Sequence, residues 1–302
     1  MGNSTIKNWI EEARPKTLAA SLSPVIIACA LAVIDGEFIT NAALLCIGVA
    51  VLSQIASNFA NDYFDFKHGI DGEERLGPER AVLKGRISPI AMLTGAVVTV
   101  GLACLCGLGL LIYADWKIIL VGAFIAISVF AYSAGPWPLS QHALGDIAVL
   151  LFYGIIPVNM TYFVMAGNFT IWSLLFSIGV GLLSVNILIV NNYRDIEQDR
   201  AAGKITTAVL FGRKIIRVAY LGNVLISSAV IIIYSQTWLS IAATAIALML
   251  GIITWIEMSK KEDQELNIPF GHTARNVLIY ALLCSFTVLE DVIGCVWTGL
   301  FY

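Results

Sequence analysis

The chain has 302 residues, of which 58% are hydrophobic and only 13% are charged, and its formal net charge is −3. An ordinary soluble domain has roughly 45–50% apolar and about 25% charged residues, so this composition excludes a soluble globular protein and indicates an integral membrane protein. The slightly negative charge gives no support for a nucleic-acid partner.

Nine apolar stretches follow one another along the chain, separated by short polar segments. A hydrocarbon core of about 30 Å requires roughly 20 apolar residues per helical span. The sequence therefore predicts a single all-α domain, residues 1–302, built as a bundle of nine transmembrane helices. The predicted spans are 18–34, 42–60, 90–113, 118–134, 144–166, 171–190, 215–234, 239–258 and 277–297.

The basic residues are distributed unequally over the two sets of connections between these spans. Of the 18 Lys and Arg residues, only Lys117 lies in the set that does not include the N-terminus. Because basic loops are retained on the cytoplasmic side, we expect a cytoplasmic N-terminus, cytoplasmic loops at 61–89 and 192–214, and an external C-terminus. The predicted location is the inner (cytoplasmic) cell membrane.

The second span ends in a cluster of amide and carboxylate side chains, NFANDYFDFKHGID, which runs from Asn58 to Asp71. On a helix, Asn58, Asn61, Asp62 and Asp65 fall at positions i, i+3, i+4 and i+7. This spacing places the four side chains on one face.

The sixth span ends in a similar cluster, NNYRDIEQDR, in which Asn192, Asp195 and Asp199 fall at i, i+3 and i+7. The two clusters form a faint internal repeat. Spans two and six run in the same direction, so the repeat is parallel, as in some transporter folds.

Acidic groups this close together repel one another, and polar groups at membrane depth are costly unless they are paired or functional. Magnesium binds one or two carboxylates together with the phosphate oxygens of a substrate. A magnesium-bridged diphosphate above an apolar cavity is therefore the simplest ligand. Solvated loops with ion pairs and a secondary transporter are the alternatives.

Basic residues near the clusters can neutralise a phosphate: Arg75, Arg80, Lys84, Arg194, Arg200 and Lys204.

Several segments resemble the UbiA superfamily of intramembrane aromatic prenyltransferases, and most closely its 1,4-dihydroxy-2-naphthoate branch in menaquinone synthesis. They are ARPKTL (13–18), NDYFDFKHGID (61–71), RLGPERA (75–81), YSAGPWPL (132–139), ALGD (143–146) and NNYRDIEQDRAAGKITTAVLFG (191–212). They occur in family order, whereas the last three spans carry little signature.

The resemblance implies a central cavity, open to the cytoplasm and to membrane lipid, in which a polyprenyl diphosphate alkylates 1,4-dihydroxy-2-naphthoate with loss of carbon dioxide to give demethylmenaquinone. Asp62 and Asp65, with Asn58 or Asn61, would hold one Mg²⁺ ion, and Asp195 and Asp199, with Asn192, a second. These four aspartates are the predicted catalytic residues. Arg80, Lys84 and Lys204 would neutralise the diphosphate, and Arg200 can add to this charge.

The predicted substrate pocket contains five further residues whose roles stay open. Tyr132 and Tyr153 can line the prenyl channel or anchor helices at the membrane interface. Arg14 and Lys16 can bind the acceptor carboxylate or extend toward the lipid headgroups. Asp146 can belong to the pocket or simply begin a helix, where a carboxylate is favourable.

Two other enzyme assignments fit the sequence less well. The D-G-x-x-A-R continuation of the CDP-alcohol phosphatidyltransferases is absent, because Asp71-Gly72 runs into Glu73-Glu74-Arg75. Within the superfamily, the alternative acceptors are 4-hydroxybenzoate and a haem, chlorin or homogentisate-type ring. The pattern defines neither the prenyl chain length nor the oligomeric state, and it gives no role to the adjacent acids Glu290 and Asp291.

Overall fold

The computed structural model describes residues 2–70, 76–290 and 292, and over these residues the chain is helical without a β-strand. The first half contains α1 (Gly2–Ala13), α2 (Pro15–Ile34), α3 (Thr40–Lys67), α4 (Pro89–Gly109), η1 (Leu110–Ile112), α5 (Ile118–Ala131), η2 (Leu139–Gln141), α6 (Gly145–Leu150) and η3 (Leu151–Ile155). The second half contains α7 (Ile156–Ala166), α8 (Ile171–Arg194), α9 (Ile196–Ala201), α10 (Thr207–Tyr234), α11 (Trp238–Lys260), η4 (Asp263–Leu266) and α12 (Asn267–Val288).

Seven helical stretches among the described residues are long and apolar enough to cross a membrane. They are Pro15–Ile34, Thr40–Lys67, Pro89–Ile112, Gly145–Ala166, Ile171–Arg194, Thr207–Tyr234 and Trp238–Lys260. The chain is thus a multi-pass membrane protein, as its composition predicts. The predicted fourth span corresponds to the shorter α5, with 14 residues.

The ninth predicted span corresponds to α12, which is not one of the seven stretches. This helix begins at Asn267 instead of residue 277, so Arg275 lies within a helix and not in a loop as expected. Glu290 accepts a hydrogen bond from Thr237 Oγ1 at 2.5 Å. Asp291 and the span's last residues, 293–297, lie outside the described part of the chain.

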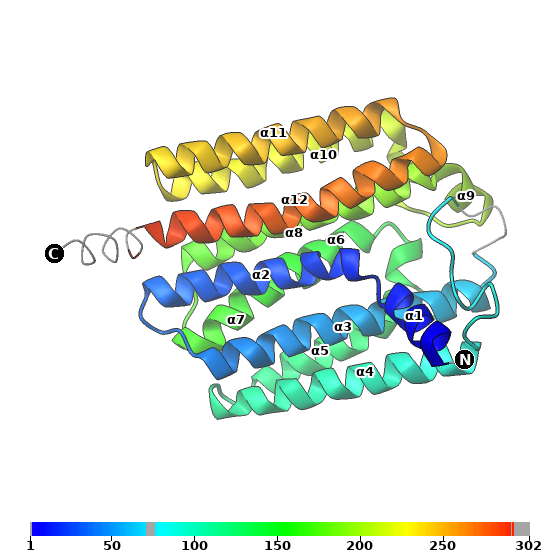
Figure 1. Ribbon diagram of the computed structural model, residues 1–302, viewed down its shortest axis with the longest axis horizontal. Coiled ribbons are helices and arrows are strands. Elements are labelled where there is room, and N and C mark those ends of the chain that lie inside the picture. The colour runs from blue at the N-terminus through cyan, green and yellow to red at the C-terminus, as the bar shows by residue number, and fades with distance from the viewer. Residues whose placement is uncertain (1, 71–75, 291, 293–302) are drawn as a thin grey trace.

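The long helices lie side by side, with α1 and α9 at one end of the bundle and the described end of α12 at the other (Figure 1). Helix α8 is the most enclosed span, since 72% of its apolar window is buried, against 11% for Pro89–Ile112. It packs against α10, α12 and α7. The second cluster, at the end of α8, is therefore held in the interior of the bundle.

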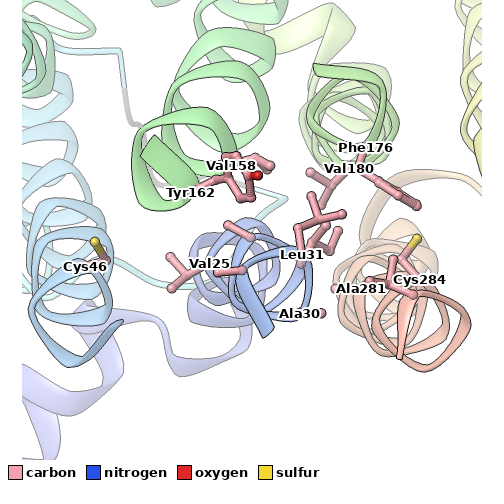
Figure 2. Packing of buried hydrophobic residues seen from close by; sticks show 14 of the residues in the cluster. Val25, Ala30, Leu31, Cys46, Val158, Tyr162, Phe176, Val180, Ala281 and Cys284 are labelled. Carbon is pink, nitrogen blue, oxygen red and sulfur yellow. The ribbon is translucent and has the colours of Figure 1, made fainter. Parts of the chain in front are cut away.

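A hydrophobic core forms where α2, α7, α8 and α12 meet (Figure 2). Leu31 of α2 lies on the side of Phe176 and Val180 of α8, whereas Val25 of the same helix points toward Cys46 of α3. Small residues such as Ala28 and Ala281, both fully buried, allow these helices to approach closely. Large apolar side chains on the outside, including those of Ile90, Leu105, Ile112 and Trp238, are exposed, as expected of helices that face lipid.

Two helices depart from the continuous spans that the sequence predicts. The span Gly145–Ala166 contains a π-helical turn at Leu151–Ile155, just before Pro157, which has no N–H to donate to the helix. Helix α8 ends at Arg194, and Asp195 separates it from the short α9. Asn192, Asp195 and Asp199 therefore do not share one uninterrupted helix, contrary to expectation.

Candidate active site

A central cavity of about 570 Å³ is enclosed by residues of α2, α3, α5, α6, α8 and the connections between them. Both polar clusters reach it. Its remaining wall is largely apolar and includes Leu108, Ile119, Phe152, Met160 and Val164. The cavity thus combines acidic and basic groups with space for a hydrocarbon chain.

The first cluster lies on the last three turns of α3, where Asn58, Asn61 and Asp65 line the cavity. Asn58 is fixed on both sides: its Nδ2 donates to the Ala13 carbonyl at 3.0 Å, and its Oδ1 accepts from Gln54 Nε2 at 3.1 Å. Asn61 Oδ1 accepts a hydrogen bond from the Ser133 hydroxyl. The helix spacing of this cluster therefore gives the predicted common face.

Asp62 differs from its neighbours because its side chain is fully buried between two arginines. Arg14 Nη2 lies 2.5 Å from Asp62 Oδ1, and Arg80 contacts the same oxygen. Arg80 also lies 3.4 Å from Asp65 Oδ2. Asp62 thus binds the two arginines that line the cavity, while Asp65 itself reaches the cavity wall.

In the second cluster, Asn192, Asp195 and Asp199 all line the cavity. Both oxygens of Asp195 accept hydrogen bonds from the Arg194 guanidinium at 2.7 Å. Arg194 is almost completely buried and also donates to the side chains of Asn191 and Asn267. The sequence suggests that Arg194 binds a phosphate. In the structure it does not line the cavity, and its guanidinium instead binds Asp195 and Asn191 of the cluster.

Asp199 lies 3.3 Å from Lys204 Nζ, and both side chains line the cavity. Burial raises the pKa of Asp199 above its ordinary value, the negative charges of Asp195 and Asp65 act in the same direction, and Lys204 opposes them. Because Asp65 of the first cluster and Asp199 of the second both line this cavity, the two clusters border the same space.

The donor set fits a divalent cation that is shared with a phosphate group. Among the described residues, no group of three or more His, Cys, Asp and Glu side chains could hold a metal ion. Asp199 Oδ2 is nevertheless buried without a hydrogen-bond partner in the described part of the chain. Magnesium needs only one or two carboxylates when substrate phosphate and water complete its octahedron, so Asp65 and Asn61 on one side, and Asp199 and Asn192 on the other, are suitable ligands.

The structure brings some of the predicted basic residues to the cavity and leaves others outside. Arg14, Arg80 and Lys204 line it. Lys84 is half-exposed and lies 4.0 Å from Glu79, and Arg200 is paired with Glu197 at 2.7 Å on the surface. Lys16 is also exposed. Lys84, Arg200 and Lys16 therefore do not reach the cavity in this structure.

The other predicted pocket residues, Tyr132, Tyr153 and Asp146, all line the cavity. The Tyr153 hydroxyl donates to Gln54 Oε1. Asp146 Oδ1 is buried without a partner among the described residues. Two backbone hydrogen bonds hold the segment just before the helix that carries Asp146. The Ala143 N–H donates to the Ile205 carbonyl at 2.7 Å, and the Ile205 N–H donates to the Gln141 carbonyl at 3.0 Å.

Two residues of the site, Gln54 and Ser133, are not among those that the sequence predicts, and both line the same cavity. Gln54 extends the helix stripe of the first cluster by one turn, since it lies four residues before Asn58. That spacing was the available signal. Ser133 lies in the family-like segment 132–139, directly after the predicted pocket residue Tyr132, and that position was its only signal.

The fold and the site define a membrane prenyltransferase of known type. Residues 21–276 match the model of the UbiA prenyltransferase family, and the chain belongs to this family. It is 38% identical to the 1,4-dihydroxy-2-naphthoate octaprenyltransferase of Haemophilus influenzae over 74% of this chain and 73% of that protein. It is 32% identical to the enzyme of the same name from Mycobacterium tuberculosis, over 92% of this chain and 96% of the relative.

Solved structures of the family share the fold. A UbiA homolog from Archaeoglobus fulgidus, bound to DMAPP and Mg²⁺, superposes with a TM-score of 0.65 at 16% identity, covering 92% of this chain and 98% of the homolog. A homolog from Aeropyrum pernix gives a TM-score of 0.67 at 14% identity, covering 90% and 98%. Family membership argues against the secondary-transporter alternative.

Proposed function

We propose that the protein transfers a polyprenyl group from polyprenyl diphosphate to 1,4-dihydroxy-2-naphthoate, with loss of carbon dioxide, as a step of menaquinone biosynthesis. The observation that carries the proposal is one cavity with two facing acidic clusters, cavity-lining basic residues and a long apolar wall. The acceptor is supported by the names of the bacterial relatives, which are naphthoate octaprenyltransferases from five different species.

The proposed cofactor is Mg²⁺, held by the two clusters and by the diphosphate. Asp65 with Asn61 would hold one ion, and Asp195 and Asp199 with Asn192 the other. Asp62 and Asn58 belong to the first site but are held by Arg14, Arg80 and Ala13 in this structure. Bound magnesium supplies positive charge that stabilises the departing diphosphate.

The protein's own charges act on the same leaving group. Arg80 and Lys204 line the cavity beside the acids, so their positive charge faces the position proposed for the diphosphate and increases in effect as the C–O bond breaks. The bonding electrons leave with the diphosphate, and an allylic cation remains. The ring faces of Tyr132 and Tyr153, both on the cavity wall, can stabilise that cation.

The acceptor and the prenyl chain would occupy different parts of the cavity. Arg14 lines the cavity, as Tyr153 does, and it is the proposed partner of the naphthoate carboxylate until that group leaves as carbon dioxide. The apolar wall would hold the prenyl chain. Since each buried methylene contributes only about 0.8 kcal/mol, we expect several chain lengths to be accepted.

The proposed setting is the inner cell membrane, with nine spans, the cavity open to the cytoplasm and a cytoplasmic N-terminus. The distribution of basic residues supports this orientation. The positions of α1 and of the described end of α12 at opposite ends of the bundle also fit an odd number of spans (Figure 1).

An acceptor competition assay tests the proposal. Purified protein is incubated with Mg²⁺, geranylgeranyl diphosphate and equal amounts of 1,4-dihydroxy-2-naphthoate and 4-hydroxybenzoate, and the products are identified by mass. We expect the prenylated naphthoate product to have lost the mass of carbon dioxide. Equal or faster conversion of 4-hydroxybenzoate would reassign the acceptor, and no product with either ring would contradict the proposal.

A further inference from the structure

Three consecutive residues where α1 meets α2 contact the first cluster and the turn that carries Arg80. Glu12 Oε1 accepts a hydrogen bond from the Ala81 N–H at 2.6 Å. The Ala13 carbonyl accepts from Asn58 Nδ2 at 3.0 Å, and Arg14 lies 2.5 Å from Asp62. The junction of α1 and α2 therefore supports the cavity wall, and of these three residues Arg14 lines the cavity itself.

The turn that follows Arg80 is compact and rests on α1. The Ala81 carbonyl accepts from the N–H groups of Arg86 at 2.8 Å and Ile87 at 3.3 Å. Ala81 itself is fully buried in a cluster that also contains Phe59 and is packed against Trp9 of α1. The only contact of an α1 carboxylate with the backbone of this turn, among the described residues, is that of Glu12 with Ala81.

Two features indicate that this contact serves the site. Glu12 is only 3% exposed, and burying a carboxylate is costly unless it is paired or hydrogen-bonded. Two residues later, Arg14 adopts a left-handed backbone conformation with φ of 53°, which is unfavourable for a non-glycine residue. Such costs are accepted where the surroundings require one definite geometry.

We propose that Glu12 is a positioning residue for diphosphate binding: by accepting the Ala81 N–H it holds Arg80 at the cavity, between Asp62 and Asp65. This inference rests on the proposed role of Arg80 in binding the diphosphate. Glu12 itself does not line the cavity, so it acts through the turn and not through contact with the substrate.

Replacement of Glu12 by Gln and by Asp separates this role from a charge effect on Arg14. Gln keeps an acceptor oxygen at the same reach and loses the charge, whereas Asp keeps the charge and withdraws it by one methylene. Glu11 provides the matched control, because this adjacent acid contacts the same turn only through the partly exposed side chain of Arg86, and not through the turn's backbone; its other partner is Lys7.

The experiment measures KM and kcat of the purified full chain for geranylgeranyl diphosphate and for 1,4-dihydroxy-2-naphthoate. For Glu12→Ala and Glu12→Asp we expect the KM for the diphosphate substrate to rise about tenfold, with the naphthoate KM within twofold of wild type. Glu12→Gln and Glu11→Ala should stay within twofold for both substrates. A thermal shift with Mg²⁺ and inorganic pyrophosphate should fall in parallel with the diphosphate affinity.

Several results would overturn the inference. An unchanged diphosphate KM in Glu12→Ala, or an equal rise in both KM values, contradicts a positioning role. Full activity of Glu12→Asp combined with a defective Glu12→Gln assigns the effect to charge, and this pair decides the matter even if Glu12→Ala does not fold. An Arg80→Ala variant with wild-type diphosphate KM would instead contradict the proposed role of Arg80, on which the inference depends.

Discussion

At the scale of single residues, the two cavity acids of the second cluster are held differently. Asp195 is bound at both oxygens by Arg194, while Asp199 Oδ2 has no hydrogen-bond partner in the described part of the chain. Of these two acids, Asp199 is therefore the one with a buried oxygen available to a cation, and its substitution gives the clearest test of the proposed magnesium site.

We predict that Asp199→Ala lowers kcat about 10²–10³-fold, the effect of removing one preorganised electrostatic contact. Thermal stability without substrate should change little, because losing the ion pair with Lys204 is offset by removing a buried carboxylate that Asp195 and Asp65 repel. The control is Glu197→Ala, two residues earlier, whose exposed side chain pairs with Arg200. Activity is measured over a range of Mg²⁺ concentrations; wild-type turnover in Asp199→Ala at every concentration contradicts its role as a ligand.

Arg194 gives a prediction of the opposite kind, on stability. Its buried guanidinium binds Asp195, Asn191 and Asn267, so Arg194→Ala leaves three partners without a donor. Because breaking one side of a buried pair typically costs about 3–5 kcal/mol, and Asp195 keeps some access to water, we expect the lower end of this range. Arg194→Lys should recover only part of it, since lysine cannot bind both oxygens in a fork. Thermal unfolding of the purified variants measures the loss; equal stability of all three proteins would contradict it.

At the scale of elements, the π-helical turn of η3 packs directly against α8. A Cβ atom on Gly154 would lie 2.4 Å from the Ser177 carbonyl oxygen and 2.6 Å from Gly181 Cα. Both are backbone atoms, so no side-chain rotation can relieve the contact. The close approach of the two elements thus depends on glycine, and it places both Asp146 and Tyr153 on the cavity wall.

We predict that Gly154→Ala separates η3 from α8 and destabilises the protein by about 1–3 kcal/mol, the usual cost of overpacking. Gly101→Ala in α4 is the matched control, since no atom lies within 4 Å of its added Cβ. There the gain in helix propensity, up to about 1 kcal/mol, should leave stability equal or higher. The check is the midpoint of thermal unfolding, and a Gly154→Ala protein as stable as Gly101→Ala would show that the elements can move apart at no cost.

At the scale of the whole molecule, the orientation in the membrane is the remaining prediction. Reporter fusions placed after Lys67 and after Lys204 should read cytoplasmic, and a fusion after Tyr302 should read external. The reason is the nearly complete segregation of basic residues to one set of connections. A cytoplasmic reading at Tyr302 would mean an even number of spans and would contradict the nine-span arrangement.

The sequence by itself determined the helical membrane class and the composition of the two clusters. Both follow from short-range patterns: apolar runs of sufficient length, and polar residues that return to the same helix face every three or four positions. Asn61, Asp65 and Asn192 reach the cavity for this reason. The first cluster was expected on one helix face and is found there, because α3 continues to Lys67.

Only the tertiary structure decided which of these groups face the cavity and which hold its walls. Glu12 and Ala81 are 69 positions apart, and Arg194 and Asn267 are 73 apart. No periodicity links such pairs, because they meet only when distant helices pack together. For the same reason Asp62 is buried between Arg14 and Arg80 instead of lining the cavity, and Lys84 pairs with Glu79 outside it. Local spacing sets the face of a helix on which a side chain lies, but the partner on that face is supplied by the packing of the whole bundle.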